Sequence, residues 1–271
     1  MTGTGRIVRG ATGIAAVVAL SELLAVTGVV PPGFLPPASA VLARAAHLVV
    51  DPAFLAQIAA TVRAWLTGLA VAVAVGVPAG LLIGGVPAAG AAVRPVLEFL
   101  RPIPSVALIP LVSLLLGAGR TTEVTLVAFA ATWPVLFNTV YGVQDQDPVP
   151  RETLRVFGFG RATVLWLVAL PAAAPFIATG VRLAAAVGLI LAVGTEILAG
   201  FGDGLGVFIA QAQQVVDGTV DVLAGTVCAG VLGLVANAVL AGAERRLFHW
   251  HPSQRPLSPR PAAATARAVR R

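Results

Sequence analysis

Lysine is absent from this sequence, and cysteine occurs only once. All 18 basic residues are arginines, and charged residues make up only 11% of the 271 positions. A Walker-type phosphate loop needs a lysine for the nucleotide phosphates, so this chain lacks the usual ATP-binding loop. Because Cys228 is the single cysteine, an internal disulfide is excluded, and we expect a buried thiol in an apolar run.

Apolar residues, in contrast, form 58% of the chain, and the mean hydropathy is +0.92. These values are typical of polytopic membrane proteins and not of soluble domains. The net charge of +6 does not indicate nucleic-acid binding, because the arginines lie at the ends of apolar runs and in the tail, without interleaved aromatic residues. We therefore predict an all-α, polytopic protein that is surrounded by membrane lipids and binds no nucleic acid.

Six apolar stretches come close to the length of about 20 residues that a bilayer requires. We predict membrane spans at residues 11–30, 65–85, 102–118, 123–143, 174–198 and 221–243. Residues 1–10 form an N-terminal tail, 31–53 an interfacial segment on the outer side, and 54–245 the main transmembrane domain. The Arg-, Pro- and Ala-rich tail at 246–271 is expected to be disordered.

The first stretch has two interpretations. Ala38-Ser39-Ala40 resembles a signal-peptide cleavage site. The apolar run is, however, too long for a signal peptide, and it contains Glu22, so we favour an uncleaved first span. In the segment after it, Ser39 is expected to cap a short interfacial helix. Its predicted apolar face consists of Val41, Leu42, Ala45 and Leu48.

Glycine and proline punctuate the middle of the chain. Gly76, Gly80 and Gly84 recur at every fourth residue, a spacing that lets membrane helices pack closely, and packing within one subunit is favoured over a dimer interface. A short turn with Arg94 and Glu98 is expected to lead to the third span. Three prolines should kink that span: Pro102, Pro104 and Pro110.

Residues 145–171 form the one sizeable polar segment between two long apolar runs, and they are typical of a helix, a glycine break and a second helix. Asp147 can cap the first helix, with Pro148 at its first position. Gly158 and Gly160 allow the bend that ends it. Arg151, Glu152 and Arg155 lie about one turn apart, Leu154 and Phe157 form an apolar edge, and the chain re-enters an apolar run at Leu170-Pro171.

This segment resembles the coupling signature of ATP-binding-cassette importer permeases. In that signature Glu-Ala-Ala is followed at fixed gaps by Gly, by an aliphatic residue and by Leu-Pro. Here Glu152, Gly158, Val168 and Leu170-Pro171 match every gap, whereas Thr153 and Leu154 replace the two alanines. The sequence LPPASAVLARA at 35–45 is also similar to the segment after the first span in sulfonate, taurine and nitrate permeases.

The resemblance implies a six-span permease with the type I importer (MetI-like) fold, which functions as a pair with a second permease copy or a homologous permease. It implies that a helix at about 148–158 binds a separate ATPase subunit, itself a dimer, and that an extracytoplasmic solute-binding protein delivers the substrate. The residues expected to couple to the ATPase are Arg151, Glu152, Leu154, Arg155, Phe157, Gly158, Leu170 and Pro171. The substrate would be a small sulfonate-, taurine- or nitrate-like solute.

The arginines give an independent test of orientation, because cytoplasmic loops of membrane proteins are enriched in positive charge. With the N-terminus in the cytoplasm, the inner segments hold arginines 6, 9, 94, 101, 151, 155, 161, 245, 246, 255, 260, 267, 270 and 271. The outer segments hold only Arg44, Arg63 and Arg120. We therefore expect both termini and residues 145–171 to be cytoplasmic, in a multi-pass protein of the plasma or inner membrane.

Few polar residues lie within the spans. Glu196, Asn138 and Arg182 are candidates for the solute pathway or its gate, although packing roles are favoured. Arg182 and Glu196 lie roughly 21 Å apart on one helix at 1.5 Å per residue, so they cannot pair; we expect Arg182 to reach the inner interface and Glu196 to border the pathway near the outer side. His249 and His251 do not form a convincing metal site, no cofactor is expected, and the glycine-rich loop and polar helix at 201–218 are not a dinucleotide site.

Three other functions fit the sequence less well than an importer permease does. A secondary transporter or channel would need no ATPase, but it would be expected to show inverted repeats and more buried carboxylates. An intramembrane enzyme is disfavoured because no nucleophile and base can be paired. A purely structural membrane anchor leaves the spacing of residues 152–171 unexplained.

Overall fold

The computed structural model describes residues 3–30, 33–100, 102–200 and 202–248. Within these ranges every regular element is helical. Five long apolar helices can cross a membrane: α1 (Gly3–Val26, apolar from Val8), α3 (Pro52–Gly85), α6 (Arg120–Gln144), α9 (Leu170–Ala199) and α11 (Thr219–Leu247). The prediction of an all-α membrane protein is confirmed, and α3 joins the expected lead-in and second span into one helix.

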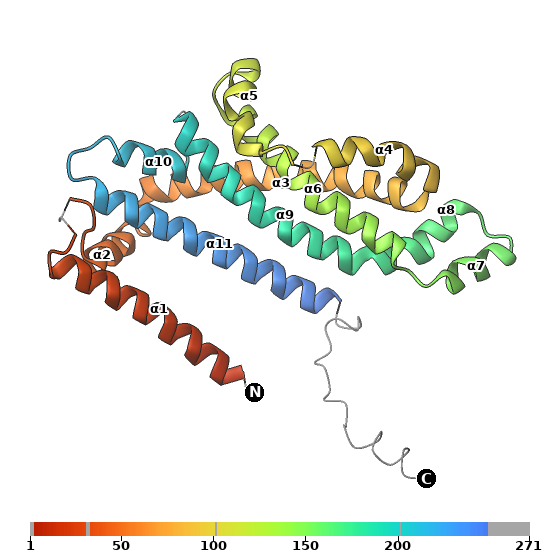
Figure 1. Ribbon diagram of the computed structural model, residues 1–271, viewed down its shortest axis with the longest axis horizontal. Helices are drawn as coiled ribbons and strands as arrows, with labels where there is room; N and C mark the ends of the chain where they lie inside the picture. Colours follow the sequence, from red (N-terminus) through yellow and green to blue (C-terminus); the bar gives the residue numbers. More distant parts are fainter. Residues whose placement is uncertain (1–2, 31–32, 101, 201, 249–271) are drawn as a thin grey trace, which may run out of the picture.

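Helices α3, α6, α9 and α11 lie side by side along the long axis of the molecule (Figure 1). Helix α6 is central, because its most extensive contacts are with α3 and α9. The core between these three helices includes Trp65, Val127, Val135 and Leu189, and the indole N–H of Trp65 donates a 2.9 Å hydrogen bond to the carbonyl of Ala185. This bond satisfies the one polar group of a large buried side chain.

The glycine row of α3 packs against α6. An added Cβ would lie 3.0 Å from a side-chain carbon of Val135 at Gly76, 2.6 Å from Thr139 Cβ at Gly80 and 3.0 Å from Val143 Cβ at Gly84. The two helix backbones therefore approach as closely as small residues allow. The preference for packing within one subunit is confirmed for this row.

A second cluster joins one end of the bundle. Helix α2 (Ala38–Leu48) buries Val41, Ala45 and Leu48 against Phe54, the short helix α10 (Leu205–Ala212) and Cys228 of α11. Arg44 of α2 forms an ion pair with Asp221 of α11, and this carboxylate raises the pKa of the Arg44 guanidinium. The buried thiol expected for Cys228 is confirmed.

The third predicted span, at 102–118, is wrong as a single kinked helix. Instead, α4 (Pro87–Leu100) occupies the place of the expected short turn, and a 3₁₀ turn (Ser105–Leu108) leads into α5 (Ile109–Leu116). The axis of α4 and that of residues 105–116 differ by 78°. Helix α5 projects from the bundle (Figure 1). The closely spaced prolines explain the break, because a residue before proline is disfavoured in a helix.

Several smaller expectations are corrected near the N-terminus. Helix α1 ends at Val26 instead of residue 30, and Gly28 follows it with φ +69°. Pro37 and not Ser39 occupies the N-cap of α2; Ser39 lies within the helix and donates its hydroxyl (2.8 Å) and its backbone N–H (3.0 Å) to Glu22. Leu42 is exposed and not on the buried face of α2.

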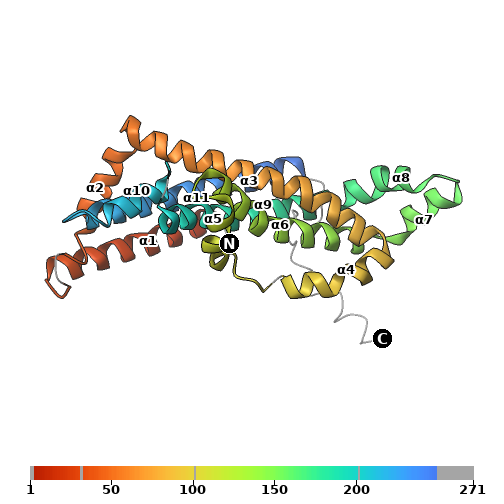
Figure 2. The ribbon, with the colours of Figure 1, turned by 90° about the horizontal axis from the view of Figure 1, so that it is seen from above.

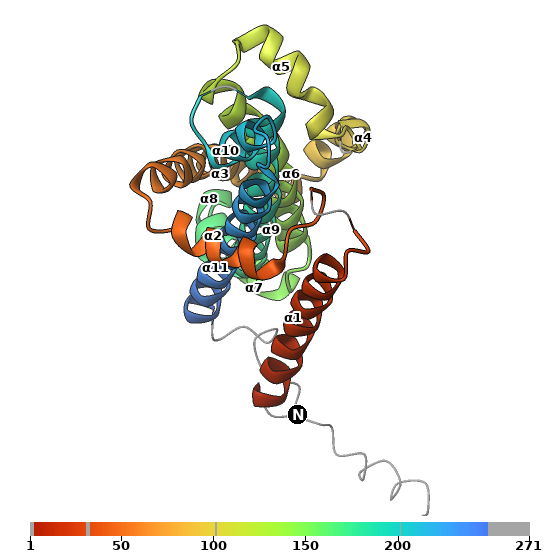
Figure 3. The same cartoon turned by 90° about the vertical axis from the view of Figure 1, so that its left-hand side faces the viewer.

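Helix α1 lies beside the bundle and contacts mainly α2 (Figures 2 and 3). None of its apolar stretch is buried within the chain, so its surroundings must be lipid or another subunit. The segment at 201–218 also differs from expectation, because α10 is an apolar, buried helix and not a polar one. The predicted tail, with His249 and His251, lies outside the described residues.

Candidate functional site

Helix α7 (Pro148–Val156) lies at the opposite end of the bundle from α2 and α10 (Figure 1). The carboxylate of Asp147 accepts a 3.0 Å hydrogen bond from the backbone N–H of Val149, and Pro148 begins the helix. This N-cap satisfies one of the free N–H groups of the first turn. The start of the helix is therefore as predicted.

A Schellman motif ends α7. The N–H of Phe159 donates to the carbonyl of Leu154 (3.0 Å), and the N–H of Gly158 donates to that of Arg155 (3.0 Å). Gly158 has φ +80°, which a side chain would make costly. Gly160 does not share this conformation, so the bend depends on Gly158 alone.

The two faces of α7 differ in exposure. Val149, Val156 and Phe157 are 61%, 86% and 75% exposed, and Glu152 is exposed on the same side of the molecule. Leu154 is half-buried, so the expected Leu154–Phe157 edge is only partly right. Sequence reasoning missed Val149 and Val156, although their spacing of seven residues places them on one helical face. The result is a short helix with an exposed apolar surface, which is typical of a docking site.

The chain returns through α8 (Arg161–Val164) and a π-helical turn, η2 (Leu165–Ala169), before Leu170-Pro171 begins α9. The N–H of Leu170 bonds to the carbonyl of Leu165, one residue farther back than in an α-helix. Pro171 has no N–H, which favours such an irregular turn. The side-chain amide of Gln146 donates to the carbonyls of Gly142 (3.0 Å) and Ala169 (2.8 Å). It therefore connects the two ends of the helical hairpin that is formed by α7, α8 and η2.

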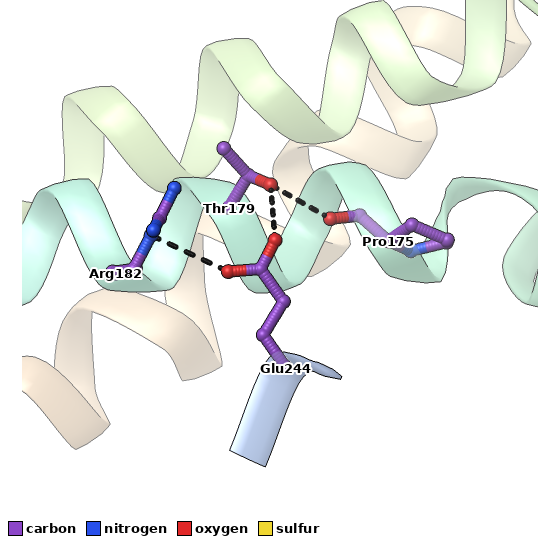
Figure 4. Close-up of polar contacts among 4 residues, drawn as sticks. All are labelled: Pro175, Thr179, Arg182 and Glu244. Atoms are coloured by element: carbon purple, nitrogen blue, oxygen red, sulfur yellow. Dashed lines mark hydrogen bonds and ion pairs between the residues drawn. The ribbon is translucent and has the colours of Figure 1, made fainter. Parts of the chain in front are cut away.

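Arg182 pairs with a carboxylate of α11. Its Nε lies 3.3 Å from Oε2 of Glu244 on α11, and the other carboxylate oxygen accepts a 3.0 Å hydrogen bond from the hydroxyl of Thr179 (Figure 4). The Glu244 side chain is only 11% exposed. Sequence analysis did not single out Glu244, which directly follows the last predicted span, and so missed this pair. It joins α9 to α11 and neutralises both charges.

Glu196 is buried at the other end of the bundle. Its carboxylate accepts hydrogen bonds from the hydroxyl of Thr61 (2.7 Å) and the backbone N–H of Gly206 (2.7 Å). Buried Glu123 of α6 lies beside it; sequence analysis missed this residue. An added Cβ at Gly206 would lie 2.7 Å from Glu196 Cβ, which explains part of the glycine-rich sequence there. Glu196 of α9 therefore connects α10 and α3 through hydrogen bonds.

Asn138 lies between α6 and α9. Its side-chain amide donates a 2.8 Å hydrogen bond to the carbonyl of Pro134, and an added Cβ at Gly180 would lie 2.8 Å from Asn138 Cβ. Asn138, Arg182 and Glu196 have three different sets of neighbours, so they do not form one site. As expected, Arg182 and Glu196 do not pair.

The arginines are unevenly distributed along the long axis of the bundle. Arg94, Arg151 and Arg155 lie on the elements at the α7 end, with Arg245 and Arg246 at the last turn of α11. Arg44, Arg63 and Arg120 lie on α2, the first half of α3 and the first turn of α6. In the described ranges, no group of three or more His, Cys, Asp or Glu residues could hold a metal ion.

Comparison with known proteins identifies this architecture. Residues 76–249 match the family model described as the binding-protein-dependent transport system inner membrane component. The chain belongs to this family. It is an ABC importer permease of the sulfonate, taurine and nitrate type, and it is a multi-pass membrane protein.

Three relatives illustrate the match. The taurine transport system permease protein of Escherichia coli (strain K12) is 31% identical over 227 residues, which cover 82% of each chain. A probable ABC transporter permease protein of Brucella melitensis biotype 1 is 33% identical over 84% of this chain and 91% of its own length. The nitrate import permease protein of Leptolyngbya laminosa is 29% identical over 68% of this chain and 65% of its own length.

Proposed function

We propose that this permease forms the transmembrane path for a small anionic or zwitterionic solute and that a separate ATPase drives it through α7. The observation that carries the proposal is the exposed apolar surface of Val149, Val156 and Phe157 on a helix fixed at both ends. An exposed apolar patch of this kind is a typical protein-docking surface. Glu152, which is also exposed, supplies a polar anchor.

The connection between α7 and the spans supports the transmission of movement from α7 to α9. Gln146 ties the base of the hairpin, and η2 connects the hairpin to α9 without an intervening loop. Displacement of α7 by the ATPase would therefore pass through Leu170-Pro171 into α9. At η2 the backbone hydrogen bond spans one residue more than in an α-helix. Such π-turns are frequent at functional sites, which is consistent with a role for η2 in coupling.

The distribution of arginines supports a cytoplasmic location for α7 and for both termini. A second permease copy or a homologous permease would complete the path, and lipid or that partner would cover α1, of which nothing is buried in this chain. The names of the taurine, nitrate and bicarbonate permeases favour a small anionic or zwitterionic substrate. A solute-binding protein would deliver it to the α2–α10 end.

Substitutions in α7 test the proposal. Gly158→Val places a β-branched residue at φ +80°, and Glu152→Arg reverses the exposed charge; both should abolish transport and ATPase pull-down while the protein still inserts in the membrane. Gly160→Val is the matched control, because an added Cβ meets nothing within 4 Å there and φ is not positive. Normal uptake by both α7 variants would refute the proposal.

The rival function, a secondary transporter or channel, makes a different prediction. Uptake by a proton-coupled secondary transporter would stop with a proton uncoupler that leaves ATP levels intact, whereas uptake through a channel would not depend on ATP. Uptake by the proposed importer should stop with ATP depletion and continue with the uncoupler.

A further inference from the structure

A cavity of about 690 Å³ lies beneath α7, between the end of α3, the start of α4 and η2. Its wall is mainly apolar and includes Leu81, Leu82, Val86, Pro87, Val164 and Leu165. The volume is within the range of about 300–1,000 Å³ that ligand sites occupy. The side chains of Arg151 and Arg155 complete the lining.

The two arginines lack an anionic partner. They lie four residues apart on α7, and neither forms an ion pair with another described residue. Nε of Arg151 is buried without a hydrogen-bond partner, and its NH2 group reaches only the carbonyl of Gly85, at a long 3.4 Å. Among the described residues that line the cavity, none is a carboxylate. Guanidinium groups over an apolar cavity are stabilised by an anion that they can bind in a fork.

The start of α4 adds to the positive potential. Pro87 and Ala88, in the first turn of this 14-residue helix, line the cavity. The N-terminus of a helix carries a partial positive charge and free backbone N–H groups. The two guanidinium groups of α7 and the start of α4 thus favour an anion in the cavity, while the remaining wall favours hydrocarbon.

We propose that this cavity binds an anionic phospholipid, with its phosphate on Arg151 and Arg155 and its acyl chains along the apolar wall of α3, α4 and η2. The cavity lies at the arginine-rich end of the bundle, where an anionic leaflet would be in reach. Basic pockets between membrane helices bind such head groups. A soluble anion would leave the apolar wall uncovered. The inference depends on Arg151 and Arg155, which line the cavity, and not on docking of an ATPase to Val149, Val156 and Phe157.

The test compares lipid binding by full-length variants purified in detergent. Native mass spectrometry would count phosphatidylglycerol and phosphatidylcholine retained from an equimolar mixture. The Arg151→Gln/Arg155→Gln variant should lose the preference for phosphatidylglycerol, by about tenfold or more, because its two charge-assisted contacts are gone. Ala88→Trp, which fills the cavity and changes no charge, should lose it as well.

Matched controls separate this site from general attraction to the basic end. Arg245→Gln/Arg246→Gln removes two exposed arginines at the same end, outside the cavity, and should keep the preference. Arg151→Lys/Arg155→Lys should keep much of it. Equal retention of both lipids by the unsubstituted protein, equal loss in the Arg245/Arg246 control, or displacement of the lipid by millimolar inorganic phosphate would overturn the proposal.

Discussion

The side-chain amide of Gln146 donates a 2.8 Å hydrogen bond to the backbone carbonyl of Ala169, 23 residues farther along the chain. The same amide also bonds to the carbonyl of Gly142, so one side chain joins the end of α6 to the π-turn before α9. The α7 hairpin therefore has a closed base, through which we expect a force on α7 to reach the spans.

Opening this base should weaken coupling. Each lost hydrogen bond is worth about 0.5–1.5 kcal/mol. Gln146→Leu should therefore reduce ATP-driven uptake several-fold in proteoliposomes while ATPase binding persists. Gln144→Leu, at an exposed position two residues earlier, should leave uptake unchanged. Equal uptake by the two variants would show that the closed base is unimportant.

The Arg182–Glu244 pair makes a prediction about stability. Breaking it from either side leaves a charge in a poorly hydrated place, so Arg182→Glu and Glu244→Arg should each lower the thermal unfolding temperature in detergent. The double exchange restores opposite charges across the same contact and should recover part of the loss. Additive losses in a double-mutant cycle would argue against a direct interaction.

The glycine row of α3 predicts opposite outcomes for one substitution at two positions. Gly80→Ala introduces a Cβ 2.6 Å from Thr139 Cβ and should destabilise the protein by about 1–3 kcal/mol. Gly85→Ala meets nothing within 4 Å and should be neutral or slightly stabilising. Thermal unfolding of both variants in the same detergent would measure the difference. Equal effects would mean that close α3–α6 packing does not determine stability.

We expect the hydrogen bonds of Glu196 to hold α10 in place. Glu196→Leu leaves the Gly206 N–H and the Thr61 hydroxyl without their acceptor, at a cost of about 1–3 kcal/mol for each buried group. Glu196→Gln keeps an acceptor oxygen and should cost less. Limited proteolysis should then cut the 202–218 segment faster in the Leu variant, with exposed Asp203→Asn as the control. Unchanged cleavage would indicate that other contacts hold α10.

Much of this fold was predictable, because long apolar runs and caps are local signals. The helical class, the spans other than the third, the Asp147 cap and the bend at Gly158 all follow from residues close together in sequence. The third span failed for a local reason too. The spacing of its prolines stops a helix, whereas sequence analysis expected only a kink.

The polar contacts were not predictable in the same way, because they join residues far apart in the chain. Glu244 meets Arg182 across 62 positions, and Glu196 meets Thr61 across 135. Only the packing of α3, α9, α10 and α11 brings these groups together. The proposed coupling role rests on spacing within one segment, whereas the exposed surface of α7 depends on how this helix is oriented against the bundle.

Cysteine labelling tests the central claim most directly. Cys228→Ser removes the single native thiol, and Val156→Cys or Val216→Cys then introduces one exposed thiol at either end of the bundle. With a membrane-impermeant maleimide, Val156→Cys should react only in inverted vesicles, and addition of the ATPase subunit should protect it. Val216→Cys should react only in intact cells. Labelling of Val156→Cys in intact cells, or no protection by the ATPase, would contradict the account.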